Sequence, residues 1–430
     1  MKPNILLVSY NFPPIVNPRS LRWIQFTRYL VRKGYNLDVL TVDRRMSCRA
    51  YDEASPGIIP MAVNVHRTYT GVIHRLNYWY WSPDKIRNQH YKNSFEALSI
   101  QELKKICKEI VKPILIPGEA IERLLLGLRM AKKIISKNHY DLIISSAMPF
   151  TDHILACFVK KWTAIPWIAD YGDPLAFNPV SPEIKWEHLG DKWIESKLLE
   201  AMDCIIVTTD ETKKGFIKYY PFLKKGQIAV IPQGYSPEEF EGVQPELGNK
   251  FRIVYTGIFY DDVREPYTFF DAIKHLKDIE LEVIVAGNIL PHYIEAAEEN
   301  NIREKIIFLG PQPHERVIAL QKGADLLLLF GWLKGYQIPG KLFEYFGACR
   351  PILCITFDEK DIAGRLIRKY NRGMVVSNNG EEIASAVRKL YGLWHKRKLN
   401  EQFWLEPTKE YSWESQAKKL ENVIRNCVKS

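Results

Sequence analysis

The sequence predicts an α/β protein built from two doubly wound, Rossmann-like domains with parallel sheets. Short runs rich in Val, Ile and Leu recur through all 430 residues, and such continuous apolar runs are typical of strands buried on both faces of a parallel sheet. Longer amphipathic stretches separate the runs, as crossover helices would. A segment rich in turn-forming residues near 232–250 interrupts the alternation, which indicates a linker between two α/β halves.

The expected strands form two series along the chain. The first series is Ile5–Tyr10, Leu37–Val42, Val63–Tyr69, Asp141–Ser146, Pro166–Tyr171 and Cys204–Thr208. The second series is Ile228–Ile231, Phe251–Tyr255, Leu281–Ala286, Ile306–Leu309, Leu326–Phe330, Pro351–Ile355 and Met374–Val376. Because right-handed crossovers join parallel strands, we expect functional loops at the carboxyl ends of these strands.

Three stretches have the spacing of amphipathic helices. In the first, Gly34 ends the helix and the shared apolar face consists of Leu21, Ile24, Tyr29 and Leu30. The other two apolar stripes are Ile121, Leu124, Leu125, Leu128 and Ala131, and Ala384, Ala386, Val387 and Leu390.

The break in the pattern sets the expected domain boundaries. We expect an N-terminal domain over residues 1–235 and a C-terminal domain over 236–410. Residues 73–117 fit the alternation badly, since Tyr78-Trp79-Tyr80-Trp81 is followed by a polar, basic stretch. We interpret this segment as an insertion on the first domain.

Composition excludes several classes of protein. Hydrophobic residues make up 46% and charged residues 26%, values that argue against disorder, collagen and coiled coil. The seven Cys contain no C-x-x-C pair, which argues against a disulfide framework or a zinc site. Apolar stretches such as Ala324–Phe330 are far shorter than the ~20 residues of a membrane span. The expectation is a soluble, cytoplasmic protein.

Positive charge is concentrated at the start of the chain. Residues 1–140 hold 23 Lys/Arg and 10 Asp/Glu, a net charge of +13, although the whole chain has only +10. A basic region favours anionic partners such as phospholipid, nucleic acid or a phosphorylated substrate, and a merely solvated surface is the alternative. Trp79 and Trp81 suggest the inner face of the cytoplasmic membrane as one such partner, bound reversibly.

The segment Gly335–Pro351 predicts a phosphate site. It follows an expected strand, and Pro339 suits the first position of a helix over residues 339–348. Such a helix would direct the N–H groups of Gly340, Lys341 and Leu342 toward a phosphate, and Lys341 would add a charge. Glu344, one turn on, could accept two hydroxyl protons of a ribose diol. The alternative is a first-turn Glu that only complements the helix dipole.

A second segment, Val254–Phe270, points to the same chemistry. Gly257 follows an expected strand, where it would let the backbone approach a ligand. Arg264 lies just before an expected helix, in a position to make a bidentate phosphate contact. Asp261-Asp262 resembles a metal-binding pair, but two adjacent loop acids are more often solvated.

In the first half, His153 follows the strand Asp141–Ser146, on the first turn of an expected helix. It could serve as a base or a hydroxyl ligand, or it could be structural. Asp173 follows the next strand, on the same edge of the sheet. Asp170 lies at the strand end itself, where we expect it to hold the loop together.

No other catalytic or nucleotide-binding motif is present. The sequence lacks G-x-x-x-x-G-K-[ST], G-x-S-x-G and, after its first strand, G-x-G-x-x-G. Nothing has the spacing of a nucleic-acid recognition motif, so nucleic acid is not an expected partner.

Taken together, these segments resemble glycosyltransferase family 4, retaining sugar-nucleotide transferases of the GT-B architecture. The resemblance includes enzymes that build bacterial surface polysaccharides and covers nearly the whole chain. It rests on the order and spacing of five motifs: Ile5–Pro14, Leu115–Gly118 with Tyr140–Ser146, Ile231–Phe240, Lys341–Tyr345 with Arg350-Pro351, and Trp413-Glu414.

The resemblance implies roles for several residues. Arg264 and Lys341 would hold the donor pyrophosphate, Glu344 the ribose, and Gly257 would lie beside the nucleotide. Residues 411–430 would form a terminal helix that returns to the first domain. No metal or other cofactor is expected, because the nucleotide sugar is the substrate. A glycan or polyprenyl-linked hydroxyl would accept the sugar.

Three positions depart from the family pattern. Tyr336 stands where the family has the first Glu of its signature, which helps to place the transferred sugar. Many relatives have a His at the position of Ser146, whereas the nearest His here is His153. The opening loop has Asn17-Pro18-Arg19-Ser20 in place of paired glycines. Arg19 and Ser146 are therefore the candidate residues on the acceptor side.

The leading hypothesis is a transferase that moves a hexosyl or related sugar in the synthesis of capsule, O-antigen or exopolysaccharide. Its expected catalytic residues are His153, Asp173, Arg264 and Lys341. A sugar-nucleotide epimerase of the same architecture is one alternative. A non-catalytic partner subunit in glycan assembly is another, because the first Glu is missing.

Overall fold

The computed structural model describes residues 2–15, 17–43, 55–69, 112–177, 187–259, 261, 264–332 and 337–429. The chain forms two compact units. The first comprises Met1–Val207, Lys213–Ile231 and Ala417–Ser430, and the second Thr208–Thr212 and Pro232–Gln416. The predicted insertion at 73–117, with Trp79 and Trp81, lies outside the described residues except at its end, where a helix begins at Lys112.

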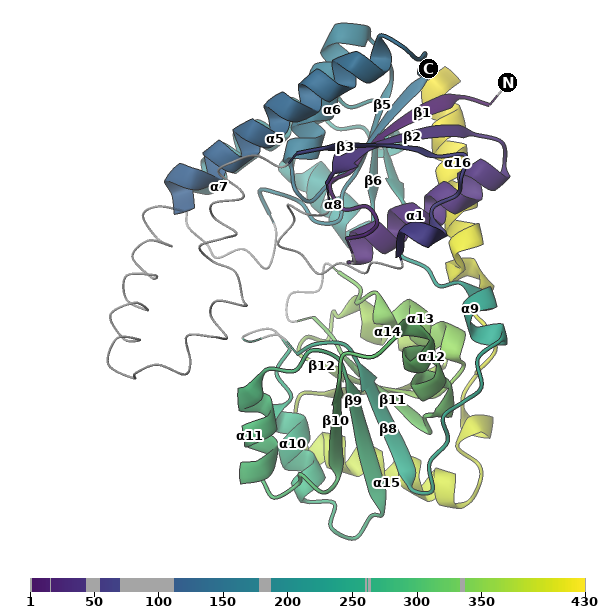
Figure 1. Ribbon diagram of the computed structural model, residues 1–430. Coiled ribbons are helices and arrows are strands. Elements are labelled where there is room, and N and C mark those ends of the chain that lie inside the picture. Colours follow the sequence, from purple (N-terminus) through teal and green to yellow (C-terminus); the bar gives the residue numbers. More distant parts are fainter. Residues whose placement is uncertain are drawn as a thin grey trace, which may run out of the picture. The chain divides into compact units, whose positions relative to one another are not determined.

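The first unit is built on a parallel sheet in the order β3-β2-β1-β4-β5-β6-β7. Its strands are β1 (Asn4–Val8), β2 (Asn36–Val42), β3 (Asn64–Thr68), β4 (Leu142–Ser146), β5 (Trp167–Asp170), β6 (Cys204–Val207) and β7 (Ile228–Val230). Its helices are α1 (Pro18–Arg32), α5 (Lys112–Ile135), α6 (Thr151–Thr163), α7 (Glu187–Ala201), α8 (Asp210–Tyr219) and α16 (Trp413–Lys429). Figure 1 shows α1 and α16 on one side of this sheet and α5 and α6 on the other.

The second unit contains a parallel sheet in the order β10-β9-β8-β11-β12-β13. Its strands are β8 (Phe251–Thr256), β9 (Leu281–Ala286), β10 (Ile306–Gly310), β11 (Leu326–Phe330), β12 (Ile352–Thr356) and β13 (Gly373–Ser377). Its helices are α9 (Pro237–Glu241), α10 (Tyr267–Lys274), α11 (Pro291–Glu299), α12 (His314–Gly323), α13 (Lys341–Ala348), α14 (Ile362–Lys369) and α15 (Gly380–His395). Both sheets are the doubly wound α/β type that the sequence predicts.

Every predicted strand is present, but one belongs to the other sheet. Ile228–Ile231 stands at the head of the second predicted series, although it lies within the N-terminal domain expected over 1–235. In the structure, β7 pairs with β6 at the edge of the first sheet. The short helix α8 is the crossover that joins these two neighbouring strands, so the chain leaves the first sheet only after β7.

Two predicted helix faces are partly wrong. Leu21 and Leu125 are 36% and 56% exposed, although both were placed on apolar inner faces. The buried face of α1 instead carries Arg22 together with Trp23 and Phe26. A count of apolar residues misses a buried arginine, because an arginine is buried only where tertiary structure supplies its partner.

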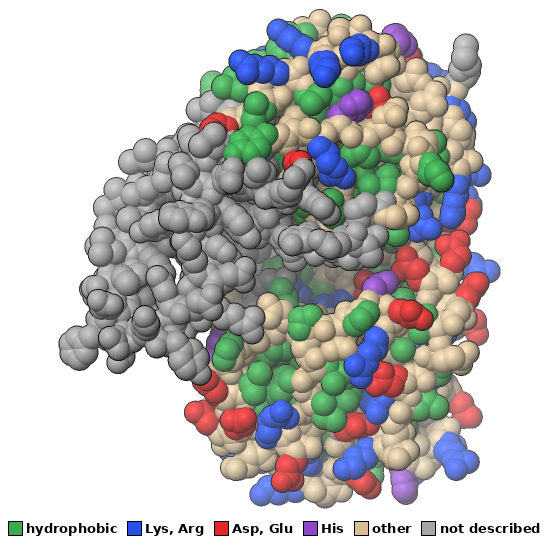
Figure 2. Space-filling model, viewed as in Figure 1, with side chains coloured by type: hydrophobic (Ala, Val, Ile, Leu, Met, Phe, Trp, Pro, Cys, Tyr) green, Lys and Arg blue, Asp and Glu red, His purple; other side chains and the backbone are tan. Residues whose placement is uncertain are grey.

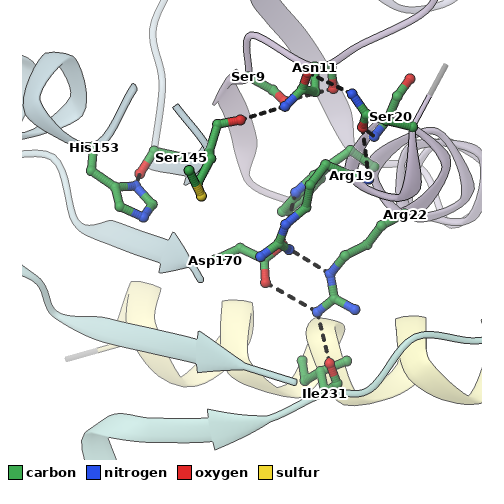
Figure 3. Close-up of polar contacts among 12 residues, drawn as sticks. Ser9, Asn11, Arg19, Ser20, Arg22, Ser145, His153, Asp170 and Ile231 are labelled. Carbon is green, nitrogen blue, oxygen red and sulfur yellow. Dashed lines mark hydrogen bonds and ion pairs between the residues drawn. The ribbon is translucent and has the colours of Figure 1, made fainter. Parts of the chain in front are cut away.

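That partner is Asp170, at the end of β5, whose side chain is fully buried. Arg22 donates to both carboxylate oxygens, from Nε at 3.0 Å and from Nη2 at 3.1 Å. Arg19 Nη1 and Trp23 Nε1 donate to Oδ2 at 3.2 and 3.0 Å. Arg22 Nη2 also donates to the carbonyl of Ile231, just past β7 (Figure 3). The sequence predicts that Asp170 holds the loop after β5 together, but the side chains that donate to it lie on helix α1, so this carboxylate fixes α1 against the carboxyl edge of the sheet.

Helix α16 is attached to the first unit by a second ionic cluster. Glu421 accepts hydrogen bonds from Lys2 at 2.6 Å, Arg425 at 2.8 Å and the Tyr35 hydroxyl at 3.1 Å. The hydrogen bond from Lys2 is the main cause that lowers the pKa of Glu421 to about 2. The C-terminal helix is therefore bound to the start of β1 and the loop before β2.

Both sheets have a switch point, where the strand order reverses direction. It lies between β1 and β4 in the first sheet and between β8 and β11 in the second. In open α/β sheets, ligands bind beside the carboxyl ends of the strands at such a point. The loops after these four strands are therefore the places where a ligand is expected.

Replacing Asp170 by Asn should strongly destabilise the first unit. The amide would leave Arg19 and Arg22 buried without a counter-ion, and breaking a buried ion pair in this way costs about 3–5 kcal/mol. Urea unfolding monitored by far-UV circular dichroism measures the difference.

The matched control is Asp278→Asn, since Asp278 pairs with Arg388 at 3.1 Å on the exposed surface. This change should alter the free energy of unfolding far less than Asp170→Asn. Equal effects of the two substitutions would contradict the role given to Asp170.

Candidate functional site

Two loops of the second unit flank its switch point and bring Gly257 and Lys341 together. Gly257 follows β8, and Lys341 begins α13 after β11. Gly257 has φ +138°, a conformation that favours glycine, and a Cβ there would lie 2.3 Å from Lys341 Nζ. Glycine is thus required both by the backbone and by the amine that approaches it.

Lys341 is a buried cation without a neutralising partner. Its Nζ lies 3.9 Å from the centre of the Tyr255 ring. Among the described residues, no hydrogen bond or ion pair to this amine is present. Burial lowers the pKa of Lys341 well below its ordinary value, and nearby Arg264 adds to the effect. An anion bound here would restore the charge on the amine.

Arg264 lies next to Lys341 in the same unit. It is only 5% exposed, just before α10, and its guanidinium lies 4.3 Å from the centre of the Trp332 ring. Guanidinium groups stack on aromatic faces and also bind planar anions such as phosphate through bidentate hydrogen bonds. Two adjacent cations at the switch point form a suitable arrangement for a diphosphate.

Glu344 is supported by a buried amide. Gln321 Nε2 donates to Glu344 Oε2 at 3.3 Å and to Thr256 Oγ1 at 2.9 Å. Burial raises the pKa of the Glu344 carboxyl, and the neighbouring His314 is the largest cause that opposes the rise. His314 in turn has a raised pKa because it bonds to Glu239 at 3.0 Å. Glu344 could therefore accept hydroxyl protons, as proposed from the sequence.

The structure corrects details of the predicted phosphate helix. Helix α13 begins at Lys341 rather than at Pro339. The Leu342 N–H, expected to face a ligand, donates to the Pro339 carbonyl at 3.0 Å in a tight first turn, and the Leu342 side chain is buried. Gly340 and Lys341 remain as candidate backbone donors.

The sequence also singled out Asp261, Asp262 and Tyr336 near this site. Asp261 is not merely solvated, because it accepts hydrogen bonds from Tyr293 at 2.5 Å and His292 at 3.2 Å. Asp262 and Tyr336 lie outside the described residues. No cluster of three His, Cys, Asp or Glu that could hold a metal ion occurs in the described part of the chain.

The first unit arranges its candidate residues on both faces of its sheet. Ser146 is paired in register with Asp170 at the carboxyl edge, and its hydroxyl is buried with no hydrogen-bond partner among the described residues. Ser145, one residue earlier, points to the opposite face. There it bonds to His153 on helix α6, with 2.7 Å between Ser145 Oγ and His153 Nδ1.

Arg19 and Asp173 lie on the side of helix α1. Besides its bond to Asp170, Arg19 lies against Gly172, where a Cβ would be 1.9 Å from Arg19 Nη2. That Nη2 is buried without a partner in the described structure. Burial raises the pKa of Asp173, and Arg19 opposes the rise. Arg19, Ser146 and Asp173 thus present polar groups at the edge of the first sheet.

Sequence reasoning missed the residues that support these groups. Gln321 donates to Glu344, and Trp332 stacks on Arg264. Ser145 bonds to His153, and Trp167 donates to Ser145. None has a motif of its own. The one available signal was that Ser145 adjoins Ser146 at a strand end.

The loops of the first unit are held in place by further buried polar groups. Asp152 on α6 accepts from Arg123 at 3.1 Å and from the Tyr10 N–H. The Asn11 amide donates to the Met148 carbonyl, which ties the loop after β1 to the loop after β4 (Figure 3). The two loops at this switch point are therefore parts of one rigid network.

Solved structures with this fold come from several enzymes. A glycosyltransferase from Rickettsia africae has TM-score 0.68 and 13% identity, with 100% of this chain and 99% of that chain covered. Sucrose-phosphate synthase from Thermosynechococcus elongatus has TM-score 0.68 and 14% identity, with 99% of each chain covered. Anabaena HepE, solved with UDP and glucose, has TM-score 0.64 and 11% identity, covering 99% of this chain and 100% of that one. At such identities the likeness concerns the fold alone.

Sequence comparison identifies the family. No curated protein matches the chain. Residues 250–392 match the model of glycosyl transferases group 1, and residues 20–239, half of the chain, match the model of Glycosyltransferase Family 4. The chain therefore belongs to glycosyltransferase family 4, and the expected GT-B fold is confirmed.

Proposed function

We propose that this glycosyltransferase moves a sugar from a nucleotide diphosphate donor to a hydroxyl of a glycan or lipid-linked acceptor, with retention of configuration, in surface polysaccharide synthesis. The observation that carries the donor assignment is the buried Lys341 amine, which has no hydrogen-bond partner among the described residues and whose pKa burial lowers. Its neighbour Arg264 supplies a second positive charge, which matches the two phosphates of such a donor.

Each donor-side residue then has a physical task. Lys341 and Arg264 stabilise the negative charge that grows on the departing diphosphate when the bond to the sugar breaks. Gly257 keeps space for the amine, and Glu344 accepts hydrogen bonds from the ribose hydroxyls. The second unit is thus the donor-binding half of the proposed enzyme. The structure of HepE with UDP and glucose supports this choice of donor class by analogy.

The polar edge of the first unit is the proposed acceptor side. Arg19, Ser146 and Asp173 offer donors and a carboxylate at the ends of β4 and β5. A sugar hydroxyl can both donate and accept a hydrogen bond, so it suits this mixed set. Retention and the surface polysaccharide role are supported by the family resemblance.

The two alternatives can be separated from transfer by one assay. An epimerase inverts a sugar centre without any acceptor, and a structure described as a putative UDP-N-acetylglucosamine 2-epimerase shares the fold at 11% identity. Incubation of UDP-sugars without acceptor should give no epimer. A non-catalytic subunit would bind UDP and transfer nothing to any acceptor.

Replacing Lys341 by Met should weaken UDP binding and slow sugar transfer. Loss of a charge-assisted hydrogen bond costs about 1.5–3 kcal/mol of binding, and loss of a preorganised donor costs roughly 10²–10³ in rate. Because the amine has a lowered pKa when free, UDP binding should also take up a proton above that pKa.

Calorimetry of UDP binding in buffers with different ionisation enthalpies measures both effects. The proton uptake should disappear in Lys341→Met and persist in Lys274→Met, which removes an exposed lysine of the same unit. Unchanged affinity in Lys341→Met would rule out the phosphate assignment.

Replacing Glu344 by Gln should weaken UDP binding by about tenfold or more, because an amide accepts hydrogen bonds from the two ribose hydroxyls less well than a carboxylate does. The loss should be smaller for the 2′,3′-dideoxy analogue of UDP, since that analogue has no ribose hydroxyls to bind. Calorimetry with both ligands measures the difference. Equal losses with UDP and its analogue would make Glu344 a structural residue.

We also propose that the first unit binds anionic membranes from the cytoplasmic side. No helix in the described part of the chain is long and apolar enough to cross a membrane. On the described surface, helices α5 and α6 lie side by side, with Lys132 over the Trp162 ring at 4.7 Å. Phe158 and Trp162 are 40% and 45% exposed. Figure 2 shows hydrophobic and basic side chains intermixed in this region, a combination that favours lipid headgroups.

The double substitution Phe158→Ser and Trp162→Ser should reduce sedimentation with phosphatidylglycerol vesicles at low salt. Basic side chains contribute about 1 kcal/mol each near such a surface, so salt should also reduce the binding. Leu247→Ser, which removes a 70% exposed side chain of the second unit, is the control. Equal sedimentation of the double variant and wild type would exclude this surface.

A further inference from the structure

His153 lies in a buried network that settles which of its ring nitrogens carries the proton. The residue is 0% exposed and packs against Tyr171, with 4.6 Å between ring centres. Its Nδ1 lies 2.7 Å from Ser145 Oγ, and Trp167 Nε1 donates to the same oxygen at 2.7 Å. Burial is the largest cause that lowers the pKa of His153 to about 3, so the ring is neutral near pH 7.

A count of donors gives the direction of the hydrogen bond between Ser145 and His153. Trp167 can only donate, so Ser145 Oγ accepts from it and retains one proton of its own. If Ser145 donates that proton to His153 Nδ1, the three side chains of this network are satisfied except for the Nε2–H of His153, which has no acceptor among the described residues. If His153 instead donates from Nδ1, the Ser145 proton and the Nε2 lone pair are both left without a partner in the described structure. Fewer unsatisfied buried groups favour the first arrangement.

We infer that Trp167 and Ser145 are positioning residues that hold His153 as the Nε2–H tautomer, so that His153 donates a hydrogen bond to a sugar hydroxyl and does not act as a base. This inference rests on the proposed function for the identity of the ligand. It revises the expectation of a base at His153, because the only lone pair of the neutral ring is occupied by Ser145.

The position of Nε2 fits this assignment. The atom is fully buried and lacks a protein partner among the described residues. His153 stands on the first turn of α6, directly after the loop that follows β4 at the switch point. Ligands bind beside such loops. A bound hydroxyl would supply the missing acceptor once a shift of the neighbouring side chains exposes Nε2, and the bonds among Trp167, Ser145 and Nδ1 would be kept.

Nuclear magnetic resonance of protein labelled with ¹⁵N-histidine tests the tautomer directly. Two-bond ¹H–¹⁵N correlations distinguish Nε2–H from Nδ1–H, and the His153 signals are identified by their loss in His153→Gln. Wild type should show one neutral Nε2–H form between pH 5 and 8. An Nδ1–H form or a charged ring in wild type would overturn the inference.

Variants test the two positioning residues. Ser145→Ala removes the proton donor and should give a mixture of both tautomers, as should Trp167→Phe, which frees Ser145 to accept from Nδ1. Ser146→Ala removes a hydroxyl from the opposite face of the sheet and should leave the His153 signals unchanged. A single Nε2–H form in Ser145→Ala would show that Ser145 does not set the tautomer.

Transfer assays then separate a donor from a base. Gln carries an N–H that can replace Nε2–H, whereas Leu carries none, so His153→Gln should transfer sugar roughly tenfold or more faster than His153→Leu. Equal rates of the two variants would overturn the role of donor. If no nucleotide sugar supports transfer by wild type, the proposed function fails, while the tautomer measurement still stands on its own.

Discussion

The buried carboxylate of Asp170 is the constraint on which the first unit depends. Four donor atoms, from Arg19, Arg22 and Trp23, converge on it, and Arg22 extends the network to the carbonyl of Ile231. The two guanidinium groups share this buried carboxylate as an ion-pair partner, and the nearby Asp173 adds a second negative charge beside Arg19. The network joins the start of α1 to the ends of β5 and β7. Helix α1, which carries the candidate residue Arg19, therefore has a fixed position relative to the sheet.

In the second unit, by contrast, the buried amine of Lys341 is not held by hydrogen bonds from the described residues. Burial, together with nearby Arg264, lowers the pKa of Lys341, while Glu344 opposes the shift. A buried charge that the fold leaves unsatisfied costs stability unless a ligand completes it. Asp170 is thus an ionic group that the fold satisfies with several hydrogen-bond donors, whereas the Lys341 amine is the group to which we assign a role in binding the nucleotide donor under the proposed function. Both occur at the carboxyl ends of parallel strands, where the doubly wound sheet reverses its order.

Polar residues next to the candidate groups determine what those groups can do. Gln321 holds Glu344 at one carboxylate oxygen, Trp332 stacks on Arg264, and Ser145 occupies one nitrogen of His153. In each case the neighbour restricts rotation of the group or fixes a proton on it. Preorganisation of this kind favours a transition state because little reorientation is needed when charge develops.

The sequence by itself determined the fold class, the thirteen strand segments and the order of the donor motifs. Continuous apolar runs and their spacing depend only on local pattern and burial, which residue types reveal. Tertiary structure alone decided the burial of Arg22 in place of Leu21 and the use of the Leu342 N–H within its own turn. It also decided the opposite faces of Ser145 and Ser146 and the proton position on His153. These outcomes depend on partners distant in sequence, since a buried polar group is defined by the atom that it meets in the folded chain.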